Sequence, residues 1–156
     1  MAIKIVVVGK TKQAPLKFLE RSYLERLNRY VKVQRVAVRE QKVLKNQETS
    51  RALQNEGKRI LREVDREDFC IVLDSQGKEM TSPELADFLK QHLLSGTREV
   101  TFVTGGPLGL AVAVKERADF LLSFSRLTFT HEMIRVLLME QLYRAWTLLR
   151  GEKYHK

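Results

Sequence analysis

Cysteine and long apolar runs are scarce in this 156-residue sequence, and each scarcity excludes a class of protein. The only cysteine, Cys70, cannot form an internal disulfide and lacks neighbouring Cys or His ligands, so we interpret it as a buried structural thiol. No apolar run approaches the ~18 residues that would span a membrane. The opening segment Met1–Val8 is too short for a signal peptide and is typical of a first strand. We therefore expect a cytoplasmic protein of one domain, residues 1–156, without a metal site.

Charge is abundant but unevenly spread along the chain. Residues 1–66 hold 17 Lys and Arg against 7 Asp and Glu, an excess of ten positive charges. Residues 67–156 hold 11 against 12, so the N-terminal part carries the whole net charge of +9. A one-sided basic field attracts polyanions, and nucleic acid is the commonest such partner. A merely solvated basic surface is the alternative interpretation.

Hydrophobic periodicity separates the expected elements. Strands are predicted at Ile3–Val8, Val31–Val38 (partly polar, hence peripheral), Phe69–Leu73, Val100–Val103 and Phe120–Phe124. Helices are predicted at Pro15–Tyr30, Asn46–Val64, from the N-cap Thr81 to near Gly96, Leu110–Ala118 and His131–Leu149. The charged, aperiodic segment Glu40–Asn46 is interpreted as a mobile basic loop. This alternation predicts an α/β fold with a mainly parallel sheet flanked by helices.

The last predicted helix carries apolar residues around nearly its whole circumference. An outer helix of a small α/β domain has one face on the sheet and one toward solvent, so the second apolar face needs another partner. A two-fold homodimer contact through this helix is the simplest answer. Enclosure of the helix within its own chain is the alternative.

Two glycine motifs follow predicted strands, and neither fits a phosphate loop. Gly9-Lys10-Thr11 lacks the earlier glycine of a Walker A motif, although Lys10 and Lys12 could face a phosphate backbone. In Thr104–Gly109 the glycine spacing departs from G-x-G-x-x-G, and Pro107 removes a backbone donor. The second loop is therefore either a tight turn or a site that needs close approach of a ligand without a pyrophosphate.

Three strand ends carry loops that meet if their strands are neighbours. They are Leu73-Asp74, Val103-Thr104-Gly105 and Phe124–Leu127. Ligands of parallel sheets bind at the carboxyl ends of the strands. Apolar side chains and backbone amides with few charges favour a flat purine and an apolar body over a triphosphate.

The motifs at these strand ends and in the last helix resemble one family of RNA methyltransferases. They are Leu73-Asp74-x-x-Gly77-Lys78, Thr104-Gly105-Gly106-Pro107-x-Gly109, Leu122–His131, Arg135-Val136-Leu137-x-x-Glu140-Gln141-Leu142-Tyr143-Arg144-Ala145-Trp146 and Tyr154-His155-Lys156. Their order and spacing are similar to those of the SPOUT (α/β-knot) superfamily, in its minimal branch that methylates N3 of a pseudouridine in 23S ribosomal RNA. The resemblance is weak before Leu73 and specific after it.

The resemblance implies a fold, a cofactor and partners. It implies a C-terminal trefoil knot, which general topology rules disfavour, an obligate homodimer, and a 23S rRNA substrate within the assembled ribosome. It implies S-adenosyl-L-methionine as cofactor, bound by Leu73, Gly105, Phe124, Ser125, Arg126, Leu127, Thr128 and Phe129. The sequence departs from many relatives at Thr130, where they have proline, so the rigidity of that loop can differ. Leu108 is assigned no role.

An imide N3–H must lose its proton before it attacks a methyl group, and cationic or hydrogen-bonding groups stabilise the anion. The candidates are Arg135, Tyr154 and His155, with His131 and Arg144 behind them. Each has a structural alternative. His131 can be an N-cap, the two arginines can pair with Glu132 and Glu140 along the helix, and the tail can be frayed. With a dimer, we favour the tail of one subunit closing over the cofactor of the other.

Two other functions compete with an rRNA methyltransferase. One is a non-catalytic RNA-binding or ribosome-associated protein of the same fold. The other is a nucleotide-dependent enzyme of doubly wound fold, which the missing phosphate-loop glycines disfavour.

Overall fold

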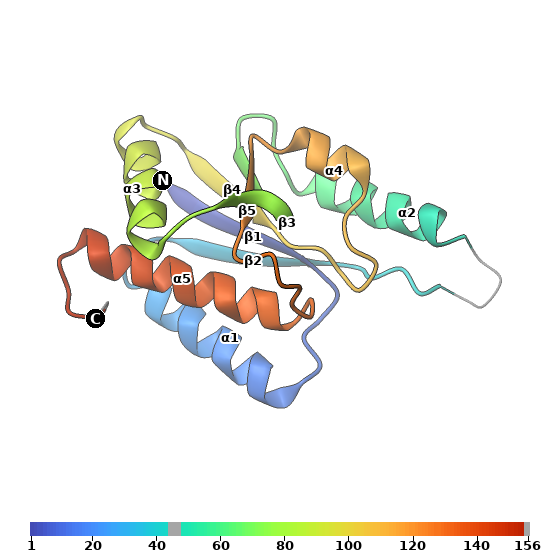
Figure 1. Cartoon of the computed structure of the whole chain (residues 1–156), viewed down its shortest axis with the longest axis horizontal. Coiled ribbons are helices and arrows are strands. Elements are labelled where there is room, and N and C mark those ends of the chain that lie inside the picture. Colours follow the sequence, from blue (N-terminus) through green and yellow to red (C-terminus); the bar gives the residue numbers. More distant parts are fainter. Residues whose placement is uncertain (44–47, 155–156) are drawn as a thin grey trace.

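The computed structural model describes residues 1–43 and 48–154, which form alternating strands and helices (Figure 1). The strands are β1 Ala2–Val8, β2 Val33–Val38, β3 Phe69–Glu79, β4 Glu99–Val103 and β5 Phe120–Ser123. The helices are α1 Ala14–Leu27, α2 Thr49–Arg62, α3 Ser82–Leu94, α4 Val112–Arg117 and α5 Met133–Leu149. None of the described helices is long and apolar enough to cross a membrane.

The described strands pair in the order β2-β1-β4-β3-β5, and every pairing is parallel. Helices α1, α3 and α5 cover one face of this sheet, and α2 and α4 cover the other (Figure 1). The apolar side chains of β1 alternate between the two cores, Ile3, Ile5 and Val7 facing the first and Val6 and Val8 the second. The predicted α/β class with a parallel sheet flanked by helices is confirmed, and so is the peripheral position of the second strand.

The third strand is longer than the sequence pattern predicted. It continues beyond Leu73 to Glu79, where the pattern indicated an end at Asp74–Gly77. After Leu73 the register with β5 shifts, and Lys78 then pairs with Leu122. A Cβ on Gly77 would lie 2.6 Å from the Leu121 carbonyl oxygen, so only glycine allows this backbone approach. The polar residues between Leu73 and Lys78 form a bulge. Because they interrupt the apolar pattern, the sequence indicated a strand end there.

Helix boundaries are close to those predicted, and one start signal is confirmed in atomic detail. The Thr81 hydroxyl accepts from the backbone of Glu84, whose carboxylate accepts from the Thr81 backbone at 2.7 Å. Helix α5 begins two residues after the predicted His131, at Met133. Of the predicted loop Glu40–Asn46, residues 44–46 lie outside the described residues. The predicted start of the second helix at Asn46 lies outside them too.

The last helix lies between α1 and α3 over the sheet (Figure 1). Leu138, Met139, Leu142 and Ala145 are fully buried there, and Trp146 is 5% exposed. Much of its second apolar face is therefore enclosed by the chain's own helices, as the alternative interpretation held. Met133, 38% exposed, is an apolar residue that this packing leaves partly uncovered.

Candidate functional site: a cavity at the carboxyl edge of the sheet

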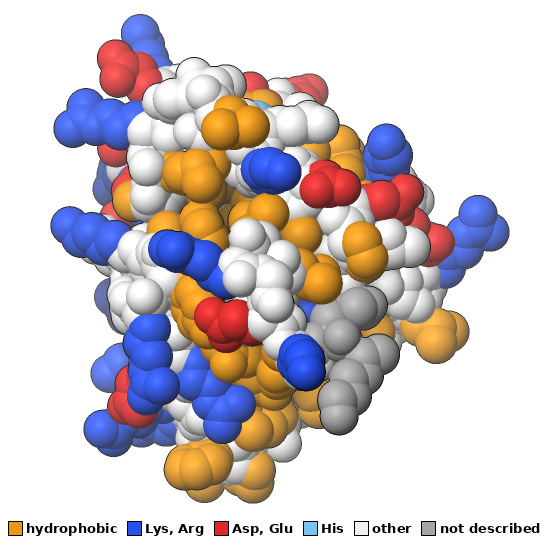
Figure 2. Space-filling model, turned by 90° about the vertical axis from the view of Figure 1, so that its left-hand side faces the viewer, with side chains coloured by type: hydrophobic (Ala, Val, Ile, Leu, Met, Phe, Trp, Pro, Cys, Tyr) orange, Lys and Arg blue, Asp and Glu red, His pale blue; other side chains and the backbone are white. Residues whose placement is uncertain are grey.

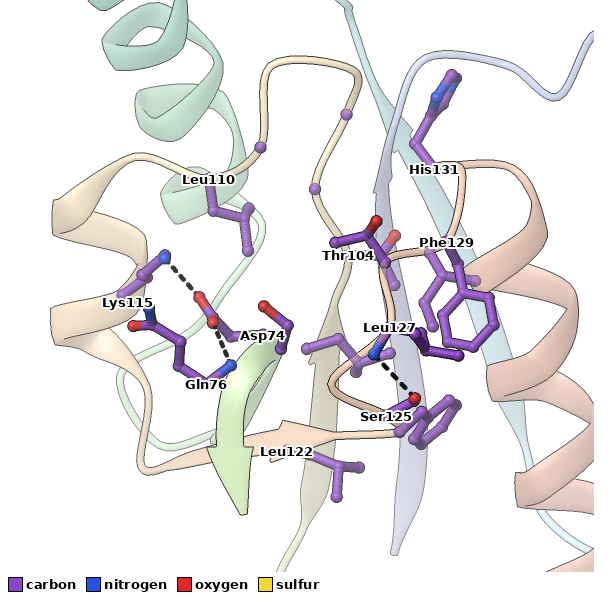
Figure 3. A pocket seen from close by; sticks show the side chains of 18 residues that line it. Asp74, Gln76, Thr104, Leu110, Lys115, Leu122, Ser125, Leu127, Phe129 and His131 are labelled. Carbon is purple, nitrogen blue, oxygen red and sulfur yellow. Dashed lines mark hydrogen bonds and ion pairs between the residues drawn. The ribbon is translucent and has the colours of Figure 1, made fainter. Parts of the chain in front are cut away.

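The bulged part of β3 and the carboxyl ends of β4 and β5 meet around a cavity of about 340 Å³ (Figure 3). Seven of the eight residues proposed for cofactor contact line it: Leu73, Gly105, Phe124, Ser125, Leu127, Thr128 and Phe129. Arg126 is exposed and is not part of the cavity wall in the described structure. The convergence of the three strand ends follows from strand order, because β4, β3 and β5 are neighbours in the sheet.

The glycine loop brings its backbone closer to its surroundings than any side chain would allow. A Cβ on Gly105 would lie 2.9 Å from the Gly109 carbonyl oxygen, and one on Gly106 would lie 2.8 Å from Val8 Cγ1. Gly109 has φ +85° and donates its N–H to the Gly106 carbonyl at 3.0 Å. The loop is thus a tight turn, and it also opens a wall of bare backbone toward the cavity.

Thr104 introduces the glycine loop and contributes a polar atom that the sequence pattern did not single out. Its side chain lines the cavity and is 1% exposed. Its hydroxyl oxygen has no hydrogen-bond partner among the described residues. A buried hydroxyl without a partner is costly unless a ligand or water satisfies it. This atom and the bare glycine backbone suit a ligand that presents hydrogen-bonding groups to the middle of the cavity.

The segment between β5 and α5 is held by its own hydroxyl groups. Ser125 Oγ accepts from the Leu127 backbone at 3.0 Å (Figure 3), and Ser123 Oγ donates to the Ser75 carbonyl at 3.3 Å. Thr130, where the family resemblance led us to expect proline in many relatives, accepts from the Met133 backbone through its hydroxyl at 3.2 Å. Threonine therefore fastens the loop to the start of α5 by a hydrogen bond, where proline would do so by restricting φ.

A charged pair lies at the end of the cavity opposite Leu127 and Phe129. Asp74 Oδ2 is 2.5 Å from Lys115 Nζ, and Asp74 Oδ1 accepts from the Gln76 backbone at 2.9 Å (Figure 3). The Lys115 hydrogen bond, followed by that from Gln76, lowers the pKa of the Asp74 carboxyl below its ordinary value. Sequence reasoning missed Lys115, since a lysine on a short amphipathic helix carries no signal of its own.

His131 lines the cavity from the first turn before α5. Burial, and then the neighbouring Arg135 charge, lower the pKa of His131 below its ordinary value. Both effects favour the neutral imidazole over the charged form. Its Nε2 lies 3.9 Å from the Glu132 carboxylate, too far for a hydrogen bond.

Arg135 is not part of the cavity wall and is completely buried. Its guanidinium donates to the Val8 carbonyl and, at 3.0 Å, to the Thr11 hydroxyl. Glu132, which was considered as its partner, instead accepts from the backbones of Lys12 and Gln13 at 2.9 and 3.1 Å. In this structure Arg135 fastens the first loop of the chain to the last helix.

Tyr154 is not among the described residues that line the cavity of its own chain. Its ring packs on Tyr143 with centroids 4.8 Å apart, and its hydroxyl donates to Glu140 at 3.2 Å. Arg144 pairs with Glu140 at 2.6 Å, as the helical spacing predicted. Ile134, in the first turn of α5, lines the cavity, whereas the Tyr154 hydroxyl reaches back to Glu140, midway along the helix. His155 lies outside the described residues.

Comparison with known proteins decides the family. Over residues 1–155 the chain matches the model of a family described as predicted SPOUT methyltransferase. The chain belongs to the SPOUT methyltransferase family. It is therefore a methyltransferase, which confirms the family and the enzyme class that the motifs resembled.

Full-length relatives and one solved structure agree with this assignment. The ribosomal RNA large subunit methyltransferases H of Carboxydothermus hydrogenoformans and Halothermothrix orenii are 42% and 40% identical, with 100% of each chain covered. That of Christiangramia forsetii is 37% identical, with 99% of each chain covered. A probable methylase family protein from Haemophilus influenzae Rd KW20 matches 99% of this chain and 70% of its own, with TM-score 0.54. At 15% identity, that structure supports the fold alone.

Proposed function

We propose that this SPOUT methyltransferase transfers a methyl group from S-adenosyl-L-methionine to N3 of a pseudouridine in 23S rRNA of the assembled ribosome. The observation that carries the proposal is the cavity, with its bare glycine backbone and the unpartnered Thr104 hydroxyl. The names of the full-length relatives support large-subunit rRNA as the substrate. Residues 1–156 would act as one domain in the cytoplasm.

The chain's own residues fit this cofactor in three ways. The glycine loop offers backbone groups without side chains, Phe124 and Phe129 offer apolar surface, and the charged pair at Asp74 offers ionic contacts. When bound, S-adenosyl-L-methionine supplies a methyl group on a cationic sulfur. Gly105 and the segment Phe124–Phe129 would orient that group for in-line attack, which is the main demand of such a displacement.

Basic surface supports a nucleic-acid substrate. The end of the molecule shown in Figure 2, opposite the end at which β1 stops in Figure 1, carries Lys and Arg side chains along its left margin, where acidic ones are fewer. Lys10 and Lys12 lie in the loop after β1, and the Lys12 side chain is 75% exposed. Because Glu132 holds the Lys12 backbone while the adjacent His131 lines the cavity, this loop is fixed close to the site. We propose that both lysines contact the RNA backbone.

We also propose a homodimer through the last helix, with each site completed by the tail of the second copy. Within one chain Tyr154 is not part of the cavity wall and its hydroxyl is turned to Glu140, which motivates a role for the tail at the cavity of the second copy. The partly uncovered Met133, with Leu127 at 75% and Phe129 at 42% exposure, gives apolar surface beside the cavity for a second copy. The C-terminal knot of the family remains part of this proposal.

Methylation of ribosomes tests the function directly. Ribosomes from a strain that lacks the native modification are incubated with the protein and methyl-labelled S-adenosyl-L-methionine, and the labelled base is identified. We expect N3-methylated pseudouridine in 23S rRNA. Binding of RNA without cofactor binding or label would favour the non-catalytic alternative.

Complementation tests the shared site. We expect a Gly105→Ala subunit, with a damaged cavity, and a subunit lacking Tyr154–Lys156 to be inactive alone. Mixed, they should regain activity, because one cavity and one tail remain intact in the heterodimer. No recovery on mixing, with dimers shown by light scattering, would contradict the exchange of tails.

Substitution of the partly exposed Met133 tests dimerisation through α5. Leu142 and Trp146 pack in the chain's own core, so charged substitutions there would unfold the protein. Met133→Glu should instead shift sedimentation from dimer to monomer. Val112→Glu, on α4 at the opposite face and 70% exposed, is the matched control and should stay dimeric. A monomeric wild type would refute the dimer.

A further inference from the structure

The cavity has two chemically different ends. In Figure 3 Asp74, Lys115 and Gln76 lie on one side, while Leu127 and Phe129 lie on the other, with Thr104 between them. Both ends belong to one continuous space of about 340 Å³. A ligand that fills it must therefore be charged at one end and apolar at the other.

The charged end is an ion pair assembled from two elements. Asp74 follows Leu73 in the bulged part of β3, and Lys115 comes from α4. The side chain of Asp74 is 10% exposed and that of Lys115 is 40% exposed, with 2.5 Å between carboxylate and ammonium. The carboxylate is thus sheltered, while the ammonium can move into solvent or toward a ligand.

The fold does not depend on this pair to hold α4 in place. Val114 is 1% exposed in the core beneath the helix. Arg117 fastens the end of α4 by donating to the carbonyls of Asp65 and Asp68 at 2.8 and 3.0 Å and to the Asp119 carboxylate at 3.1 Å. A partly exposed single ion pair adds little stability to such a framework.

A ligand that binds at the charged end must replace the ion pair between Asp74 and Lys115, and this requirement decides which chemical group fits. A neutral group, such as a ribose diol, could hydrogen-bond to Asp74 in place of Lys115 but would leave the sheltered carboxylate without a counter-charge. A zwitterion replaces the pair by two pairs, ammonium on Asp74 and carboxylate on Lys115, so no sheltered charge is left uncompensated. An α-amino acid group carries these two charges on one carbon.

We propose that Asp74 and Lys115 form the subsite for the α-amino and α-carboxylate groups of the methionine moiety of the methyl donor. This inference rests on the proposed cofactor and adds its orientation. The adenine then belongs at the apolar end, against Phe124 and Phe129. The sulfur lies between the two ends, on the side of Thr104 and the glycine loop.

Two ligands that differ only at the amino acid end test the subsite by calorimetry. S-adenosylhomocysteine carries the zwitterion, and methylthioadenosine lacks it but keeps adenine, ribose and sulfur. For Asp74→Asn and Lys115→Met we expect about tenfold weaker binding of S-adenosylhomocysteine or more, the loss of one charged hydrogen bond. The dissociation constant of methylthioadenosine should stay within about twofold of the wild-type value in both variants.

Lys78→Met, which removes an exposed lysine of β3 outside the cavity wall, is the matched control and should bind both ligands like the wild type. Equal weakening of both ligands in Asp74→Asn would place the ribose on Asp74 and overturn the proposal. Unchanged binding of S-adenosylhomocysteine in both variants would show a structural pair only and would overturn it as well. A wild type that binds neither ligand would instead refute the proposed cofactor. Melting curves check that each variant is folded. If Asp74→Asn is unfolded, the binding data for Lys115→Met decide the test.

Discussion

The amino and carboxyl edges of the same sheet treat buried charge in opposite ways. At the amino edge Lys4 Nζ lies 2.6 Å from Glu99, 3.2 Å from Asp68 and 3.6 Å from Asp65. Asp68 in turn accepts from Thr101 at 2.8 Å, so the cluster satisfies itself. At the carboxyl edge the hydroxyl of Thr104 and one carboxylate oxygen of Glu56 have no partner among the described residues.

The difference separates a stabilising edge from a binding edge. Three carboxylates gather at the amino edge in a way that would suit a cation, but the ammonium of Lys4 lies among them. Glu56, 1% exposed, lies behind the glycine loop and, among the described residues, accepts only from the Gln41 backbone at 2.7 Å. Its other oxygen would be 3.6 Å from a Cβ on Gly106. The carboxyl edge thus leaves polarity uncompensated close to the cavity.

Removing the cation of the amino edge should have the largest effect on stability. Lys4→Met leaves Asp68 and Glu99 without their counter-charge, and we expect a loss of about 3–5 kcal/mol in the free energy of unfolding. Urea unfolding measures it, with exposed Lys10→Met as the control. Cofactor affinity should not change in the folded fraction. A stability equal to the wild type would show that the cluster is dispensable.

The same cluster predicts a pH dependence at high pH. Burial alone lowers the pKa of Lys4, but the hydrogen bonds and charges of Glu99 and Asp68 outweigh it, so the pKa is raised. A raised pKa gives stability that is fully present below the unfolded value of about 10.4 and is lost as pH rises through the folded pKa. Lys4→Met should lack this loss as pH rises above about 10.4, as measured by unfolding curves at each pH.

At the binding edge, Gly105→Ala should affect ligand binding more than folding. Its Cβ would meet the Gly109 backbone at 2.9 Å, so the loop must shift into or away from the cavity. Overpacking of this kind costs about 1–3 kcal/mol in stability. Because moving the loop relieves the strain, we expect most of this cost to appear as a fall in S-adenosylhomocysteine affinity, about 5- to 150-fold in calorimetry. Gly96→Ala is a control with nothing within 4 Å of the added Cβ. It should bind normally despite its strained φ of +77°.

The smallest expected effect concerns Glu56. Burial raises the pKa of its carboxyl, despite the Gln41 hydrogen bond. Stability from this group is therefore present below the unfolded value of about 4.3 and declines as pH rises through the folded pKa. Glu56→Gln should flatten that decline by less than about 1 kcal/mol, because glutamine can still accept from Gln41. An unchanged slope in pH-dependent unfolding would show that Glu56 titrates normally.

Sequence patterns predicted the carboxyl edge better than the buried charges around it. Strand ends and glycines have local signatures, so Leu73, Gly105 and the segment from Phe124 could be placed before any coordinates. Arg135 was expected in the chemistry, but it is buried against Val8 and Thr11, because a helix pattern does not show which distant loop its charged face meets. The pairing of Asp74 with Lys115 was also invisible, since it depends on how α4 returns to β3.

The fastening of the first loop by the last helix has a consequence for synthesis of the chain. The bonds from Glu132 to Lys12 and from Arg135 to Thr11 span 120 and 124 residues. Thr11, Glu20 and Arg35 bond to one another, and Arg135 completes this buried network. When only the first four strands have left the ribosome, the nascent chain still lacks Arg135. Contacts of such sequence separation close late. The edge that carries the proposed site is therefore completed only when nearly the whole polypeptide has been made.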